Sequence, residues 1–399
     1  MMGAGLASAF PPAAEALLLK YKSAGFKAYF VGGCVRDALL GITPADFDIA
    51  VSATPKQTEQ LLSDCKIIPT GIKHGTLTVI YKDIKAEVTT FRKEGSYTDR
   101  RHPDAVEFTD SASEDAARRD FTVNALFYNP WEGIVDFYGG KDDIKAGVLR
   151  CVGDPYRRFS EDALRLLRAL RFAARFGFEI EQNTAKAMED CAPLVADLAA
   201  ERVLAELKLL FTTECQAYID RFPTVISAAL GCNGKTVAIA SYPLEYRLPI
   251  FIAEYCGNIQ SALECIKGLK PDGVTFQAVK AAAEAVYGGG IGDRALLARA
   301  ARRYGTENAR MMCTLCQNKG LPLVNGWSEY IDLLQTGAAP LQLRDLSVRG
   351  TMLGVDGADI GKLLEKLYDY AHNSMTNDTA SLLMAAETIK KQTEKEKEQ

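Results

Sequence analysis

Two aspartates, Asp46 and Asp48, stand two residues apart in a stretch, residues 46–51, whose pattern is typical of a β-strand. Side chains at positions i and i+2 of a strand lie on one face, so the two carboxylates would repel each other unless a cation bound between them. Mg²⁺ prefers oxygen ligands and assists phosphoryl transfer. Glu87, in the strand-like residues 86–90, would add a third carboxylate from a neighbouring strand. Each acid could equally be an exposed strand or turn residue.

A pair of glycines, Gly32 and Gly33, lies about a dozen residues upstream of these acids. The pair follows the strand-like residues 28–31 and opens a short helix at 34–40, with Arg36 in its first turn. Glycines at such a position let backbone N–H groups approach phosphate oxygens, and a helix N-terminus favours anions. A tight turn without a ligand is the alternative interpretation.

The secondary structure that the sequence predicts changes near residue 150. Before it, strand-like and helical segments alternate irregularly, which predicts a mixed α and β region. After it, helical spacing dominates, which predicts an all-α region. The expected strands are 28–31, 46–51, 75–81, 86–91 and 123–129, and the expected helices are 13–23, 34–40, 160–176, 184–211, 259–267, 276–287, 294–303 and 358–372. The charged run 390–399 is expected to be a frayed, solvated end.

Length and composition bound the class of protein. The 399 residues suggest about two to four domains, and 48% hydrophobic with 25% charged residues is typical of a globular chain. No apolar run approaches the roughly 18–20 residues of a membrane span, and no basic residue precedes the first Ala/Leu-rich stretch, so we expect a cytoplasmic protein. Ten cysteines are expected to be reduced thiols, and the lone pair Cys313 and Cys316 does not make a zinc site.

Five motifs follow one another between residues 28 and 211. They are residues 32–41 with 46–48, residues 118–126, residues 136–144, residues 157–172 and residues 201–206. In this order they resemble the motifs of the bacterial-type (class II) CCA-adding enzymes and poly(A) polymerases. The resemblance is strong up to residue 211 and weaker beyond it.

The resemblance implies an α+β protein with a nucleotidyltransferase α/β head at 1–147, followed by an all-helical neck at 148–213, body at 214–338 and tail at 339–399. It implies a Mg²⁺-dependent enzyme that adds CCA to the 3′ end of tRNA from CTP and ATP. We expect tRNA as a partner and find no sign of a membrane or protein partner.

The resemblance also implies residue roles. By the resemblance, Asp46 and Asp48 are the metal ligands, Arg119 and Asp120 contact the ribose and triphosphate, and Asp162 and Arg165 read the base. From its position on a neighbouring strand, we expect Glu87 to be catalytic together with Asp46 and Asp48. We expect the following residues to bind the nucleotide: Gly32, Gly33, Arg36, Arg119, Asp120, Asn124, Asp162, Arg165, Arg168 and Arg171.

Hydrogen-bond chemistry explains how Asp162 and Arg165 could select C and A. The two residues are three apart on an expected helix with Ser160 as its N-cap, so they share a face. Aspartate accepts hydrogen bonds and arginine donates them. Cytosine and adenine each present an amino donor beside a ring-nitrogen acceptor, which matches this pair, whereas guanine and uracil present the reverse pattern. The alternative is a surface ion pair between the two side chains.

A basic stripe continues along the same helix, because Arg165, Arg168, Arg171 and Arg175 recur every three or four residues. Such a stripe could meet a triphosphate or an RNA backbone. It could equally be a solvated or salt-bridged face.

Three activities share these motifs, namely CCA addition, A addition alone and poly(A) tailing. Residues 92–101 resemble the loop that CC-adding relatives lack, and residues 70–76 resemble CCA-type members. We find no Arg-rich segment of the kind that marks bacterial poly(A) polymerases, and too few histidines for a phosphohydrolase domain. An A-adding enzyme, a poly(A) polymerase and a catalytically inactive RNA-binding module remain as alternatives.

Overall fold

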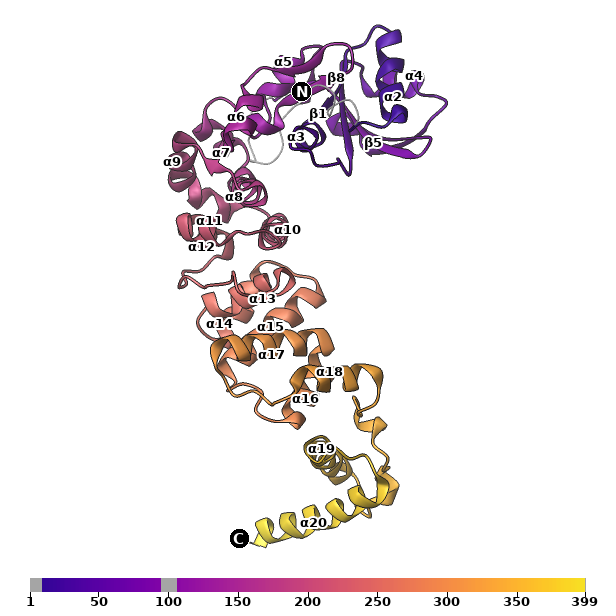
Figure 1. The fold of residues 1–399 in the computed structure, drawn as a ribbon, viewed down its shortest axis with the longest axis vertical. Helices are drawn as coiled ribbons and strands as arrows, with labels where there is room; N and C mark the ends of the chain where they lie inside the picture. Colours follow the sequence, from indigo (N-terminus) through magenta and orange to yellow (C-terminus); the bar gives the residue numbers. More distant parts are fainter. Residues whose placement is uncertain (1–8, 95–105, 399) are drawn as a thin grey trace. The chain divides into compact units, whose positions relative to one another are not determined.

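The structure is a computed structural model that describes residues 9–94 and 106–398. The chain divides into two compact units, Met1–Ala229 and Leu230–Gln399. The first unit contains a sheet with helices around it, and the second is helical throughout its described elements (Figure 1). The expected α+β class is therefore confirmed. The finer division into head, neck, body and tail stays a prediction.

A seven-stranded mixed sheet forms the centre of the first unit. Its strands lie in the order β3-β4-β5-β2-β1-β8-β9, and only the β2–β5 pair is parallel. The strands are β1 (Ala28–Val31), β2 (Phe47–Val51), β3 (Lys66–Gly71), β4 (Thr76–Tyr81), β5 (Ile84–Thr90), β8 (Leu126–Asn129) and β9 (Gly133–Asp136). Two short pairs lie outside it: β6 (Arg92–Glu94) with β7 (Val106–Phe108), and β10 (Val148–Leu149) with β11 (Glu179–Ile180).

Strand β1 is an interior strand of this sheet, between β2 and β8, and all four of its residues are buried. Phe30 packs into the core beneath α2 (Pro12–Ser23) and α3 (Gly33–Leu39). Tyr29 points to the opposite face, where a smaller core includes Phe127 and residues of α5 (Ala112–Ala117). A continuous apolar run with side chains alternating between two covered faces is what a central strand requires.

Helices complete the first unit. Besides α2, α3 and α5 they are α4 (Pro55–Leu61), α6 (Gly140–Ala146), α7 (Pro155–Glu161), α8 (Leu164–Phe176), α9 (Gln182–Cys191), α10 (Ala200–Phe211), α11 (Gln216–Arg221) and α12 (Pro223–Leu230). Three 3₁₀ turns connect them: η1 (Ile72–His74), η2 (Thr122–Asn124) and η3 (Ala192–Asp197).

The second unit is built from α13 (Leu244–Tyr255), α14 (Ile259–Gly268), α15 (Gly273–Tyr287), α16 (Arg294–Tyr304), α17 (Thr306–Lys319), α18 (Trp327–Thr336), α19 (Ala358–Asn373) and α20 (Thr379–Glu398), with 3₁₀ turns η4 (Leu343–Asp345) and η5 (Gly350–Met352). In the part of the chain that the structure describes, no helix is both long enough and apolar enough to cross a membrane.

Several local expectations are wrong. Residues 184–211 do not form one helix, because they are divided among α9, η3 and α10. Residues 160–176 do not form one helix, because α7 ends at Glu161 and α8 begins at Leu164. Ser160 therefore lies inside α7 and does not cap α8. Asp162 lies between the two helices in an extended conformation, with φ −148° and ψ 101°. The charged run at the C-terminus is also not frayed, since α20 continues over it to Glu398.

Candidate active site

A cleft of about 710 Å³ opens in the first unit. Its walls come from the start of α3, from β2, from the segment around Arg119 and from α8, with one residue of α10. Nine arginines and three aspartates line it: Arg36, Arg92, Arg118, Arg119, Arg165, Arg168, Arg171, Arg175 and Arg202, with Asp48, Asp120 and Asp162. This excess of positive charge suits a polyanionic ligand such as a triphosphate.

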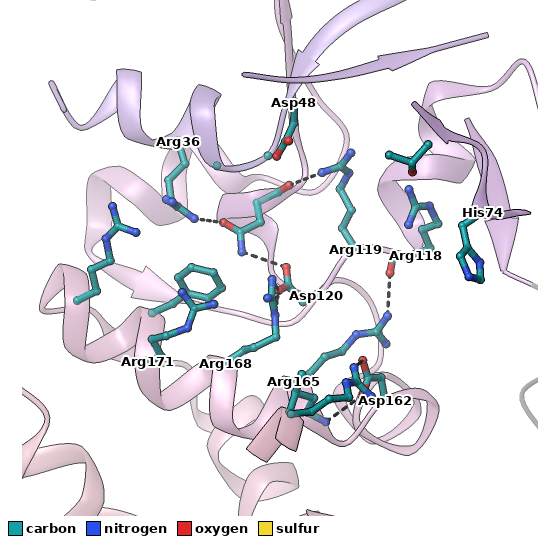
Figure 2. Close-up of a pocket in the computed structure, with 18 of the residues that line it drawn as sticks. Arg36, Asp48, His74, Arg118, Arg119, Asp120, Asp162, Arg165, Arg168 and Arg171 are labelled. Carbon is teal, nitrogen blue, oxygen red and sulfur yellow. Dashed lines mark hydrogen bonds and ion pairs between the residues drawn. The ribbon is translucent and has the colours of Figure 1, made fainter. Parts of the chain in front are cut away.

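Asp48 lies on one side of this cleft in Figure 2, and Asp162 and Arg165 lie on the opposite side. Arg119, Asp120 and Arg168 are placed between them. The structure thus brings together residues that are more than a hundred positions apart in the chain. A ligand that fills the cleft would therefore lie against Asp48, against the central residues and against the pair Asp162 and Arg165.

Asp48 lines the cleft, and strand register places a second acid, Glu87, beside it. Asp48 on β2 and Glu87 on β5 are directly paired positions of parallel strands, so the two carboxylates share a face of the sheet. Asp46 precedes β2, which begins at Phe47, so the expectation that both aspartates belong to the strand is wrong for Asp46. Burial, and then the negative charge of Glu87, raise the pKa of Asp48.

This acidic group fits a hard divalent cation by its chemistry. Within the described residues, no side chain is hydrogen-bonded or ion-paired to the Asp48 carboxylate, although Glu87 and Asp46 both add negative charge to its surroundings. The three carboxylates do not form a closed cage, because the only described group with three ligand atoms within 4.8 Å of one another is made of cysteines. The arrangement is an open site that a cation and a phosphate could complete together.

Gly32 makes room for an arginine. Its φ of +68° lies in the region that favours glycine, and a Cβ placed on it would lie 2.9 Å from Nη1 of Arg119. The Gly32 N–H donates to the Leu126 carbonyl, so this amide does not face a phosphate as the sequence suggested. Gly33 also lines the cleft.

Arg36 is buried, and its partners explain its position. Its Nε and Nη2 donate to Oδ1 of Asp37, at 2.8 and 2.6 Å, and its Nη1 donates to Oδ1 of Asn124. Its guanidinium also stacks over Phe176, with 4.5 Å between Cζ and the ring centroid. Arg36 and Asn124 therefore join α3 to the η2 turn beneath the cleft.

Asp115 holds two arginines at the cleft wall. Its carboxylate is fully buried on α5 and accepts hydrogen bonds from Nε of Arg118 at 2.9 Å and from Nη2 of Arg119 at 3.1 Å. Burial favours the neutral acid, yet the charges of Arg118 and Arg119 lower the pKa of Asp115 below its usual value. Sequence reasoning missed this residue. The signal was available, because an acid three and four positions before two arginines is helical ion-pair spacing.

Asp120 is the buried centre of a second network. Its Oδ1 accepts from Nδ2 of Asn124 at 3.0 Å, and its Oδ2 accepts from Nε and Nη2 of Arg168 at 2.9 and 2.7 Å. Burial acts to raise the pKa of Asp120, but the charge of Arg168 and these hydrogen bonds lower it to about 2. The carboxylate is thus ionised at neutral pH, and its hydrogen bonds with Arg168 join the segment after α5 to α8.

Asp162 and Arg165 do not form the surface ion pair that the sequence left open. Asp162 accepts from Nη2 of Arg202 at 3.0 Å and from the Leu164 N–H at 3.1 Å. Arg165 is buried and donates to the carbonyls of Arg118 and Arg158. Both side chains line the cleft, each held by its own partners.

The other arginines of the basic stripe form salt bridges. The sequence had left a salt-bridged face as one of two interpretations. Arg171 donates to Glu206 on α10 at 2.7 Å, and Arg175 lies 3.4 Å from Asp37. Sequence reasoning missed Asp37 as a partner, together with His74 and Thr76 at the cleft wall. Of the expected loop at 92–101, residues 95–101 lie outside the described residues.

Two family models match the first unit. Residues 28–150 match the poly A polymerase head domain, and residues 177–221 match a domain described as the probable RNA and SrmB-binding site of polymerase A. The first match covers the seven-stranded sheet, and the second covers α9, α10 and α11.

Curated relatives match about half of the chain. A CCA-adding enzyme of Leuconostoc mesenteroides is 50% identical over 208 residues, which are 52% of this chain and 51% of the relative. One from Limosilactobacillus fermentum is 45% identical over 205 residues, which are 51% and 50% of the two chains. The match thus spans about half the length of these curated relatives.

A solved structure matches more of the chain. The Bacillus stearothermophilus CCA-adding enzyme in complex with CTP is 27% identical, with a TM-score of 0.75, and the alignment covers 96% of this chain and 100% of that one. The similarity in structure therefore covers nearly all of the chain, including the second unit.

Proposed function

We propose that the protein is a template-independent tRNA nucleotidyltransferase that adds CCA to tRNA 3′ ends from CTP and ATP, and the match of residues 28–150 to the poly A polymerase head domain supports this proposal. The observation that carries the proposal is the single cleft in which Asp48, Arg119 and the pair Asp162 and Arg165 meet. The relatives named CCA-adding enzymes support the choice of substrates.

Asp46 and Asp48 would hold Mg²⁺, with Glu87 beside them. The support is that Asp48 has no partner among the described side chains while Glu87 occupies the paired position on the next strand. When bound, Mg²⁺ would lower the pKa of the attacking hydroxyl and neutralise charge on the phosphates.

The proposed reaction is an in-line displacement. The 3′-hydroxyl oxygen of tRNA forms a bond to the α-phosphorus of CTP or ATP and loses its proton, while the bond to the β-phosphate breaks and pyrophosphate leaves. Arg119 and Arg118, oriented by Asp115, face the phosphates and stabilise the charge that develops on them. Because these arginines are already held in place, little reorganisation is needed during the reaction.

Base selection is proposed for Asp162 and Arg165. Arg202 keeps Asp162 oriented, and an ionised aspartate oxygen can accept a further hydrogen bond from the amino group of cytosine or adenine. Arg165 would donate to the ring nitrogen beside that amino group. Guanine and uracil would leave buried polar groups unpaired, at a cost of about 1–3 kcal/mol each.

The four-part division belongs to the same proposal. The head at 1–147 would carry out the transfer and the neck at 148–213 would select the base, while the body at 214–338 and the tail at 339–399 would bind tRNA by its shape. A tRNA substrate places the proposed activity in the cytoplasm.

The deciding experiment is to sequence the 3′ ends of tRNA that lacks CCA after incubation with the protein and CTP, ATP or both. We expect CC with CTP alone and CCA with both nucleotides. Addition only to tRNA that already ends in CC would indicate an A-adding enzyme, and long A tracts would indicate a poly(A) polymerase. No addition by a protein that still binds tRNA would indicate an inactive RNA-binding module.

A further inference from the structure

Three cysteines of the second unit lie together although they are far apart in the sequence. Cys232 follows α12, Cys256 ends α13, and Cys265 lies on α14. Their three sulfur atoms all lie within 4.8 Å of one another, and they form the only such group of ligand atoms in the described residues. We propose that Cys232, Cys256 and Cys265 form a thiolate site for one thiophilic metal ion, with Zn²⁺ as its occupant.

The sulfur separations suit a shared ion. Thiolates that each lie about 2.3 Å from one tetrahedral Zn²⁺ are about 3.8 Å apart. The Sγ atoms of Cys232 and Cys256 are 3.8 Å apart, whereas a disulfide requires about 2.05 Å. Movements of less than about 1 Å would bring all three sulfurs into ligand positions.

Access and donor type also favour a metal. Cys232 and Cys256 are only partly buried, so an ion can enter from solvent. Soft sulfur ligands select Zn²⁺ and Cu(I) over Mg²⁺ and Ca²⁺. Three protein ligands leave a fourth tetrahedral position for water, as in open zinc sites. The site is chemically distinct from the oxygen-rich Asp48 region and independent of the proposed nucleotidyl transfer.

A metal ion bound to the three cysteines would stabilise the start of the second unit. Residues 231–243, between α12 and α13, contain no helix or strand, and Cys232 stands near the start of this segment. The Cys265 thiol already donates to the Leu230 carbonyl at 3.5 Å. One ion bound to all three cysteines would fasten the beginning of the second unit to α13 and α14. An ion that binds only the folded state stabilises it in proportion to its concentration.

The test uses the full-length, reduced, metal-free protein. Zn²⁺ binding is measured by competition with a chromophoric chelator, and Co²⁺ serves as a spectroscopic probe of thiolate ligation. We expect one equivalent of either ion, a sulfur-to-cobalt charge-transfer band, and a melting temperature that rises with Zn²⁺. Cys232→Ser and Cys265→Ser should each weaken Zn²⁺ binding by at least about 100-fold, since even loss of an outer-shell partner costs about 10–100-fold.

Cys65→Ser is the matched control, because Cys65 is also partly buried but lies in the first unit. It should bind Zn²⁺ as the wild type does. Absence of the charge-transfer band in the wild type would overturn the proposal even if a variant failed to fold. Equal affinity of the cluster variants, or a Cys232–Cys256 disulfide that forms in place of metal binding, would overturn it as well.

Discussion

Arg168 donates two hydrogen bonds, from Nε and Nη2, to the same carboxylate oxygen of Asp120, at 2.9 and 2.7 Å. The two residues are 48 positions apart, and the bond joins the segment after α5 to helix α8. Asp120 is buried, so this contact holds α8, which carries the arginine stripe, against the segment that leads into the sheet.

The Asp120–Arg168 pair should make stability depend on pH in a defined window. The folded-state pKa of Asp120 is lowered to about 2, so the stabilisation is present above its unfolded pKa of about 3.9 and is lost as the pH falls toward 2. The depression corresponds to about 2 kcal/mol. Urea unfolding of the wild type and Asp120→Asn between pH 2 and 7 should show a difference that is largest near neutrality and shrinks below pH 4. A constant difference would contradict the assignment.

Gly32→Ala should disturb the cleft through Arg119. An added Cβ would lie 2.9 Å from Nη1 of Arg119, and a φ of +68° is strained for alanine. Gly41→Ala is the matched control, because Gly41 has a φ of +74° but nothing within 4 Å of its added Cβ. Both variants should lose about 1 kcal/mol of stability. Only Gly32→Ala should raise KM for CTP, and equal KM values would show that the close approach to Arg119 is unimportant.

Asp48→Asn should abolish nucleotide transfer while tRNA binding survives, because the carboxylate is proposed to hold Mg²⁺ and not RNA. Loss of several kcal/mol of transition-state stabilisation lowers kcat by about 100-fold or more. Glu87→Gln should have a smaller effect in the same direction. Asp83→Asn, an exposed acid in the turn before β5, should be as active as the wild type. More than a few per cent of wild-type turnover in Asp48→Asn would remove Asp48 from the site.

Asp162→Ala and Arg165→Ala should relax base selection. Each removes one charged hydrogen bond to cytosine and adenine, worth about 1.5–3 kcal/mol, so discrimination against GTP and UTP should fall by about 10–100-fold. The loss should affect C and A alike. Arg221→Ala removes a half-exposed arginine on α11 and serves as the control. Incorporation of all four nucleotides measures the effect, and unchanged preference in both variants would place base choice elsewhere.

Asp115→Asn should weaken the positioning of Arg118 and Arg119 in the cleft wall. Without the full carboxylate charge, Arg118 and Arg119 lose their shared anchor, so KM for CTP should rise by about 10-fold, with a smaller change in kcat. The neighbouring Glu114→Gln, at an exposed acid paired with Lys93, should leave KM unchanged. If Asp115→Asn only lowered the melting temperature and left KM at the wild-type value, Asp115 would be a structural residue alone.

Local pattern was enough to identify several elements of this protein. The apolar residues 28–31 predicted β1 correctly, because a run that is buried on both faces must be apolar at every position. The order of the motifs predicted a resemblance to the family whose head-domain model matches residues 28–150. The spacing of Arg165, Arg168 and Arg171 placed them on one helical stripe, because helical periodicity depends only on neighbouring positions.

Tertiary structure decided which groups meet. The pairing of Asp48 with Glu87 follows from strand register, and the Asp120–Arg168 bond and the three-cysteine group follow from the path of the chain. The sequence also did not reveal the break at Asp162, where the chain leaves one helix and its carboxylate turns to Arg202. Local spacing encodes periodicity along an element, whereas partners far apart in the chain are selected by how the elements pack.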